Sequence, residues 1–400
     1  MKIFPFFYDS ISSEQMDFKL FFDPVSSDVT KALPKSAFLK SIRIFSNKMP
    51  DLKNTDIAIV GIKEHRGENS GEGIEQSADA IRKKLYGLSK GLGKNNIVDL
   101  GNLRNGPTAE DTVLRLKEVV QSLLEKDILP IIIGGSHDID YGQYMAYEAF
   151  DKMISVLGVD SSFDLEDDKK AAEADRRLHR ILVHQPNYLF NYTHLAFQTY
   201  LVDQQALNIV EKFYFEAVRL GVLRESIDEM EPSIRQADML SFDMSALSSI
   251  YAPGGQHAQV FGLTGEEACQ VCWYAGNSEK LSSAGFYGYN PLKDDVRSST
   301  AMVTATMIWY FIEGYYHRKD DRHFREKDYT KYVVSMNNQP STITFFKSQS
   351  SEKWWMEVPY PGGKAKYSRN SIVPCSYKDY ETATKGEIPE RWMTTHAKLN

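Results

Sequence analysis

Hydrophobic runs alternate with amphipathic segments from about residue 55 onward. Continuously apolar stretches of strand length predict buried strands at residues 56–62, 127–135, 154–160, 237–243 and 283–291. Longer segments with apolar residues at helical spacing predict helices at residues 77–88, 111–126 and 300–316. Apolar strands that alternate with helices are typical of a parallel sheet covered on both faces. We therefore predict an α/β protein, a mainly parallel sheet between two layers of helices.

The two ends of the chain lack this alternation. We predict that residues 55–320 form the main α/β domain. Residues 1–54 are expected to form an N-terminal extension, with some helix and turn, that packs on this domain. Residues 321–400 contain short β-like runs, such as "YVVSM" and "STITFF", separated by polar stretches. They predict a C-terminal extension with short strands.

Composition narrows the class of protein. The net charge of −7, with both signs mixed along the chain, argues against a nucleic-acid partner. The chain contains no run of about 18 apolar residues, the length that a membrane span needs. Three cysteines in 400 residues suit a reducing compartment, so we expect a soluble, cytoplasmic protein. Cys269 and Cys272 form a C-x-x-C within a helical pattern, which favours core packing over a metal site.

Polar residues end, or closely follow, three of the predicted strands. They are one histidine and three acids, namely His137, Asp160, Asp164 and Asp243. In open parallel sheets, functional groups gather just beyond the carboxyl ends of the strands. A single aspartate there is more often a helix cap or a turn residue, and a fold with no metal stays an alternative. Four such residues at neighbouring strand ends favour a metal site.

A series of motifs, in order, resembles the ureohydrolases, which include arginase, agmatinase, proclavaminate amidinohydrolase and formimidoylglutamase. The motifs are Gly-Gly-x-His, Asp-x-x-x-Asp, Ser-Phe-Asp, Ala-Pro-Gly, Gly-Leu-Thr and Asn-Pro, at residues 134–137, 160–164, 241–243, 252–254, 262–264 and 290–291. The early segment Ala80-Ile81-Arg82 also matches the family. The resemblance covers residues 55–318, and the long N-terminal extension is most similar to the formimidoylglutamase-like branch.

The resemblance implies a three-layer α/β/α fold and two Mn²⁺ ions that activate a water to attack a guanidino or formimino carbon. Residues matching the ligands of the first ion are His137, Asp160, Asp164 and Asp243. The family's proton-shuttling histidine corresponds to His179 in "RRLHRIL", and the alternative is an ordinary polar-surface histidine.

The second metal site departs from the family pattern. Ser162 and Ser245 stand where the family has the histidine and the carboxylate that bind only the second ion. Gly288 stands where the family has the glutamate that holds the substrate's cationic group. Crowded carboxylates without a cation repel one another. We therefore expect one divalent ion, Mn²⁺ in the first place, with Mg²⁺ or Ca²⁺ as alternatives.

Two functional hypotheses follow from these departures. The first is a hydrolase of linear amidines that uses one metal ion and acts on a small amidine or amino-acid-derived substrate. The second is a metal-stabilised, catalytically silent family member that acts as a binding or assembly protein. Because the family commonly forms trimers or hexamers, the resemblance also implies a homo-oligomer.

Overall fold

The structure is a computed structural model that describes residues 17–30, 33–91, 93, 95–321, 326–337, 339–360 and 371–399. Residues 1–16 of the predicted N-terminal extension lie outside the described residues. So do residues 322–325 and 361–370 of the predicted C-terminal extension.

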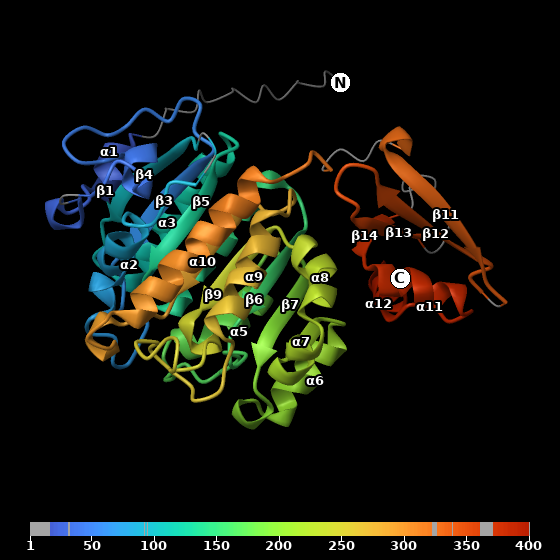
Figure 1. Cartoon of the computed structure of the whole chain (residues 1–400). Coiled ribbons are helices and arrows are strands. Elements are labelled where there is room, and N and C mark those ends of the chain that lie inside the picture. Colours follow the sequence, from blue (N-terminus) through green and yellow to red (C-terminus); the bar gives the residue numbers. More distant parts are fainter. Residues whose placement is uncertain are drawn as a thin grey trace, which may run out of the picture.

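The main sheet contains ten strands within the described residues, in the order β1-β4-β3-β5-β10-β9-β6-β7-β8, with β2 paired to β4 (Figure 1). Their bounds are β1 (Phe22–Asp23), β2 (Ile42–Ile44), β3 (Ile57–Ile62), β4 (Ile97–Leu103), β5 (Leu129–Gly134), β6 (Ile154–Val159), β7 (Leu189–Phe197), β8 (Glu216–Arg219), β9 (Met239–Asp243) and β10 (Ser283–Tyr287). Every pair is parallel except β1 with β4. The predicted mainly parallel sheet is confirmed.

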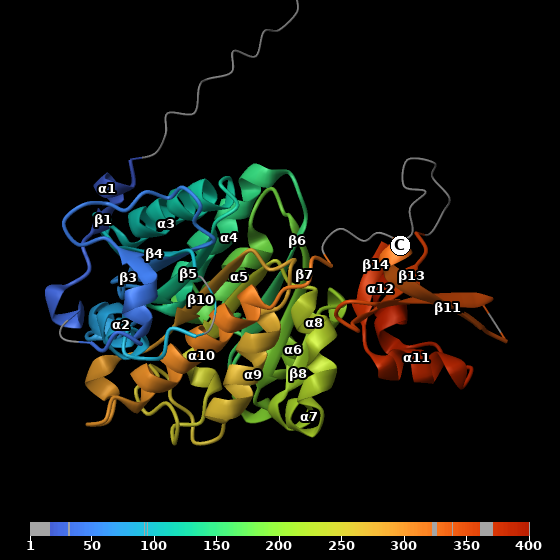
Figure 2. The same cartoon turned by 45° about the horizontal axis from the view of Figure 1, so that its top comes forward.

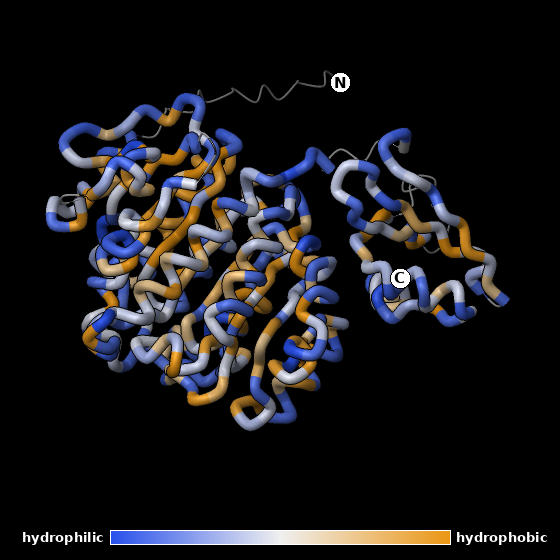
Figure 3. The backbone as a smooth tube through the Cα atoms, viewed as in Figure 1, coloured by the Kyte–Doolittle hydropathy of each residue, from blue (hydrophilic) through white to orange (hydrophobic). Residues whose placement is uncertain are grey.

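Helices cover both faces of this sheet, as Figures 1 and 2 show together. One face carries α2 (Ser77–Leu85), α9 (Gly265–Gly276) and α10 (Ser299–Tyr316), and the other carries α3 (Ala109–Leu124), α4 (Asp140–Met145) and α5 (Arg177–Val183). Successive residues of a strand point to opposite faces. Ile57 and Ile59 of β3 accordingly pack in the core under α2, whereas Ala58 and Val60 pack under α3. These two packed faces make a three-layer α/β/α architecture. Hydrophobic residues line the central strands (Figure 3).

The sequence pattern missed β4 for an identifiable reason. Asp99 and Asn102 interrupt its apolar run, yet both are buried. They accept hydrogen bonds from Arg82 of α2, a fully buried residue whose Nε and Nη2 lie 2.8 Å from the two carboxylate oxygens of Asp99. The ion pair fastens the helix to the strand, and it explains why charged residues occur inside a buried strand.

A second, antiparallel sheet follows the main body near the C-terminus. It comprises β11 (Tyr329–Ser335), β12 (Thr342–Ser348), β13 (Trp354–Val358) and β14 (Ser371–Cys375), and two helices follow it, α11 (Tyr377–Thr384) and α12 (Glu390–Leu399). The sheet contacts α8 (Glu231–Arg235), where the Arg235 guanidinium lies 4.3 Å from the centre of the Trp355 ring. The strands predicted for this part of the chain are confirmed.

The remaining helices are short. They are α1 (Phe18–Phe21), α6 (Gln204–Lys212) and α7 (Leu220–Glu225). Among the helices that the structure describes, none is both long enough and apolar enough to cross a membrane.

Candidate metal centre

The predicted site residues are brought together by the register of four adjacent strands. Ile133 of β5, Phe286 of β10, Phe242 of β9 and Val159 of β6 are paired in one row across the sheet. Each strand ends at this row or one residue beyond it, so the segments that follow the strands meet at one edge. The positive φ angles of Gly134 and Gly135, +84° and +83°, then turn the chain away from β5.

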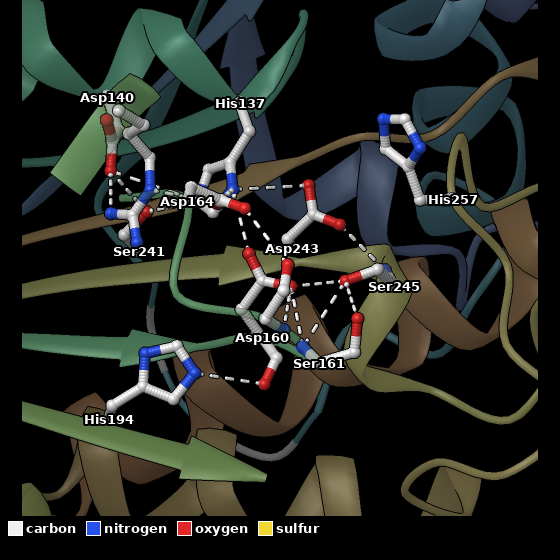
Figure 4. A network of polar contacts seen from close by, with 12 residues as sticks. His137, Asp140, Asp160, Ser161, Asp164, His194, Ser241, Asp243, Ser245 and His257 are labelled. Carbon is white, nitrogen blue, oxygen red and sulfur yellow. Dashed lines mark hydrogen bonds and ion pairs between the residues drawn. The ribbon is translucent and has the colours of Figure 1, made fainter. Parts of the chain in front are cut away.

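His137 lies at the centre of the cluster that results. Its Nδ1 is 3.1 Å from Asp160 Oδ2, 3.4 Å from Asp164 Oδ2 and 3.5 Å from Asp243 Oδ2 (Figure 4). One ligand atom each from His137, Asp160 and Asp164 lie within 4.8 Å of one another. All four side chains are buried or nearly so. Three carboxylate oxygens and one imidazole nitrogen are a donor set that suits a hard divalent ion such as Mn²⁺.

The three carboxylates use their two oxygens differently. Each Oδ2 faces His137, whereas each Oδ1 accepts a hydrogen bond. Asp160 Oδ1 accepts from the Ser245 hydroxyl, and Asp243 Oδ1 accepts from the Ser245 backbone N–H at 2.7 Å. Asp164 Oδ1 accepts from the Ser162 hydroxyl at 3.0 Å. Ser162 and Ser245, the two serines that depart from the family pattern, therefore bind the Oδ1 atoms, the oxygens that do not face His137.

A further hydroxyl extends this arrangement. Ser161 donates from its hydroxyl to Ser245 Oγ at 3.0 Å and from its backbone N–H to Asp160 Oδ1 at 2.6 Å. A chain of O–H donors thus runs from Ser161 through Ser245 to Asp160 and ends on the oxygen that faces away from His137 (Figure 4).

The other nitrogen of His137 is fixed by a buried network. The Ser241 hydroxyl donates its proton to Asp140 Oδ2 at 2.7 Å, so at 2.9 Å from His137 Nε2 it accepts that nitrogen's proton. The Nδ1 lone pair is then left for a ligand on the side of the carboxylates. Arg177, which is fully buried, donates to Asp140 Oδ2 at 2.7 Å and lies 3.5 Å from Asp164 Oδ2.

The electrostatics of the cluster favour a bound cation. Burial and the charge of Asp160 raise the pKa of Asp164 to about 7. Burial, aided by Asp160 and opposed by His137, raises the pKa of Asp243 to about 6. Burial also disfavours the charged form of Asp160, but the hydrogen bond and charge of His137 hold its pKa well below the ordinary value. Like charges are crowded here, and a divalent ion relieves their repulsion.

His137 itself carries positive charge among these acids. Burial and the charge of Arg177 lower the pKa of His137, but the surrounding carboxylates outweigh them and raise it to about 10. A proton and a divalent ion therefore compete for the same Nδ1 position.

Gly288, where the motif resemblance implies a substrate-binding glutamate in the family, packs against the cluster. Its φ is +74°, and a Cβ placed on it would lie 2.1 Å from Asp243 Oδ2. Only glycine fits a left-handed backbone this close to a neighbouring carboxylate. The position therefore cannot carry an acid in this chain without moving Asp243.

The structure does not bring His179 into the cluster. His179 is half-buried on α5, two residues after Arg177, whose guanidinium points toward Asp140 and Asp164. Residues two apart on a helix face different sides. Within the described part of the chain, no hydrogen bond or ion pair joins His179 to these acids. The predicted catalytic role of His179 has no contact here to support it.

Another histidine lies beside the cluster instead. His257, from the loop after the Ala-Pro-Gly motif, is drawn next to Asp243 in Figure 4 and pairs with Glu68 at 3.1 Å. Nothing in the local sequence indicates a role for His257, because its contact with Glu68 comes from a distant loop. Arg177 was missed for the same reason, since nothing in its local sequence indicates that it turns inward.

The cysteines follow the prediction of core packing. Cys269, Cys272 and Cys375 are free and buried, and burial raises the pKa of each thiol. Neither Cys269 nor Cys272 belongs to the group of metal-ligating atoms found among the described residues.

Comparison with known proteins agrees with this fold. The model of the arginase family matches residues 55–313, and the chain belongs to that family. Among curated relatives, the formimidoylglutamase of Streptococcus pyogenes is 24% identical over 294 residues, covering 67% of this chain and 87% of the relative. The formimidoylglutamase of Geobacillus sp. is 24% identical over 272 residues, covering 65% of this chain and 81% of the relative.

Solved structures show the same fold. Formimidoylglutamase from Bacillus subtilis superposes with a TM-score of 0.63 at 17% identity, covering 71% of this chain and 93% of that one. Formiminoglutamase from Trypanosoma cruzi, solved with Mn²⁺, superposes with a TM-score of 0.61 at 21% identity, covering 68% of this chain and 97% of that one. The resemblance inferred from the motifs is confirmed.

Proposed function

We propose that the chain is a formimidoylglutamase-like hydrolase of a linear amidine or formimino C–N bond, and that it holds a single divalent ion, Mn²⁺. Membership of the arginase family supports the reaction class. The formimidoylglutamase relatives support the formimino or amidine substrate. The T. cruzi structure with Mn²⁺ supports the choice of metal.

The proposal of one ion rests on the different contacts of the two oxygens of each carboxylate. His137 Nδ1 and the three Oδ2 atoms would hold the ion, because each Oδ2 faces His137 Nδ1 and the Oδ1 atoms accept hydrogen bonds elsewhere. An ion bound there lowers the pKa of water and supplies positive charge beside the reacting carbon. The remaining roles belong to the chain, since Ser241 and Asp140 hold His137 in the tautomer that presents Nδ1.

A second ion is disfavoured by the same hydrogen bonds. It would share Asp160 and Asp243 with the first, but the outer oxygens of both already accept hydrogen bonds from Ser245. Neither Ser162 nor Ser245 supplies an imidazole or a carboxylate. A single divalent ion leaves the three carboxylates with one net negative charge, so charge balance does not require a second ion.

One observation favours the second candidate function, a catalytically silent family member with a binding or assembly role. Gly288 offers no carboxylate to a cationic substrate, and its contact with Asp243 excludes one. Desolvating an amidinium without an opposite charge costs several kcal/mol, on the order of what a buried unpaired ion costs.

Turnover decides between the two candidates. The protein loaded with Mn²⁺ is assayed with N-formimino-L-glutamate, L-arginine and agmatine, and the hydrolase proposal expects release of formamide or urea. Asp243→Asn should abolish that release, whereas the exposed Asp167→Asn serves as the matched control and should retain it. No product above background with any of the three substrates supports the silent alternative.

We further propose that residues 55–320 form the functional unit, to which residues 1–54 and 321–400 are extensions. The mixed charge and three free cysteines support a cytoplasmic location. A homo-oligomer stays a prediction from the family resemblance, and sedimentation of the purified chain tests it.

A further inference from the structure

Residue 288 is a glycine and carries no acid, but the carboxylate of Glu68, from a loop distant in sequence, lies near the segment that contacts Gly288. Glu68 lies in the segment 64–73 between β3 and α2, and only 4% of its side chain is exposed. It faces His257 Nε2 at 3.1 Å. The residue before His257, Gln256, donates its backbone N–H to Gly288 O at 2.7 Å. Glu68 and His257 are therefore anchored beside the glycine that replaces the family's glutamate.

Side-chain hydrogen bonds hold the three segments together. Gln256 donates from Nε2 to Ser70 O at 2.9 Å, which ties segment 64–73 to the loop that carries His257. Asn290 donates to Glu72 O at 2.9 Å and to Gln256 Oε1 at 3.1 Å. Because each loop is held at two points, the position of Glu68 is fixed by the fold rather than by chance contact of a mobile loop.

A second carboxylate faces the same segment. Asp138 is 1% exposed, and its Oδ1 has no hydrogen-bond partner among the described residues. A Cβ added to Gly67 would lie 1.9 Å from that oxygen, so the carboxylate is directed at the backbone next to Glu68. A buried, unpartnered carboxylate oxygen is costly and indicates a missing donor.

The surrounding charges are acidic as well. Asp175 is close enough to interact electrostatically with both Glu68 and His257. The nearby cation Arg180 is already paired, with Glu110 at 2.7 Å and Glu173 at 3.4 Å. The group beside the metal cluster thus has an excess of negative charge that a cationic ligand would balance.

We propose that Glu68 and Asp138 form an acidic subsite that receives the protonated nitrogen group, an amidinium or guanidinium, of the substrate. This inference rests on the proposed function and names the substrate class as cationic. His257 covers Glu68, and because 52% of its side chain is exposed, it can swing into solvent as the ligand's N–H groups take its place. The subsite supplies the negative charge for the substrate's cationic group, which Gly288 cannot supply because it has no side chain.

Paired probes of equal shape test the charge requirement. L-Arginine is compared with neutral L-citrulline, and agmatine with neutral N-carbamoylputrescine, by calorimetric titration of the Mn²⁺-loaded protein. Each cation should bind about tenfold or more tightly than its neutral partner, as a charge-assisted hydrogen bond predicts. Glu68→Gln, which keeps the shape of the side chain, should remove this preference.

Two further variants separate binding from structure. His257→Asn removes the group that competes for Glu68, so it should strengthen cation binding several-fold, a sign opposite to that of Glu68→Gln. Glu72→Gln, at an exposed position of the same segment, is the matched control and should bind like the unsubstituted protein. All three variants should keep the Mn²⁺ stoichiometry and the circular dichroism of the parent.

The outcomes are distinguishable from failure of the proposed function. A protein that binds the cations selectively but turns nothing over supports the subsite and refutes the hydrolase. Equal affinity for charged and neutral probes overturns the subsite, as does undiminished binding in Glu68→Gln. Failure of both cationic probes to bind overturns it too, whatever the turnover of N-formimino-L-glutamate.

Discussion

Gly288→Ala tests how closely the residue at this position controls the metal cluster. The left-handed conformation costs a side chain about 1–2 kcal/mol, and the backbone here has a φ of +74°. The new Cβ would lie 2.1 Å from Asp243 Oδ2 and 2.8 Å from its Cγ, so Asp243 must move. Overpacking of this kind typically costs about 1–3 kcal/mol. We expect Gly288→Ala to lower the free energy of unfolding by about 2–5 kcal/mol in total.

The same displacement should weaken metal binding. Because Asp243 Oδ2 is one of the oxygens that face His137, moving it should lower Mn²⁺ affinity about 10–100-fold, the range found when the support of a ligand is lost. Urea unfolding measures the stability and calorimetric titration measures the affinity. Gly221→Ala is the control, since nothing lies within 4 Å of a Cβ at that position. If Gly288→Ala unfolds and binds Mn²⁺ like the control, the close packing of Gly288 on Asp243 is refuted.

Other predictions follow from the same cluster. Ser162→His combined with Ser245→Asp should raise the metal content from one ion to two by elemental analysis. A content that stays at one would contradict the inference that these serines replace the ligands of a second ion. Arg177→Met leaves a buried carboxylate without its partner, so it should cost about 3–5 kcal/mol in urea unfolding; an unchanged midpoint contradicts this. The raised pKa values of Asp164 (about 7) and Asp243 (about 6) mean that the folded state binds more protons than the unfolded state above pH 4 or so. In chelator, stability should therefore fall as pH rises from about 4 to about 7, and the raised pKa of His137 (about 10) should extend the fall to about pH 10. Mn²⁺ should abolish that fall, and a rise with pH in chelator would show the wrong sign.

The meeting of His137, Asp160 and Asp243 was predictable, because each of these residues is marked in its local sequence. Asp160 and Asp243 follow or end apolar runs, and His137 follows two glycines that end another run. Once the runs are parallel strands of one sheet, their carboxyl ends lie along one edge whatever their order. The chain order of motifs then identified the family, and the family supplied the ligand assignment.

The surroundings of the cluster were not predictable in the same way. The inward turn of Arg177 depends on how α5 packs against Asp140, a contact between residues 37 positions apart. The pair of Glu68 with His257 joins residues 189 positions apart through two loops. Periodicity describes one element at a time, so it carries no information on such contacts. For that reason His179 was assigned a role by alignment, and His257 was not.

Metal content tests the central claim most directly. The protein is purified without chelator, its Mn²⁺ is counted by elemental analysis, and the ion is located in crystals by anomalous scattering at the manganese edge. We predict one ion per chain, contacted by His137 Nδ1 and by the Oδ2 atoms of Asp160, Asp164 and Asp243. Two ions bridged by Asp160 and Asp243, or no ion at saturating Mn²⁺, would contradict the account.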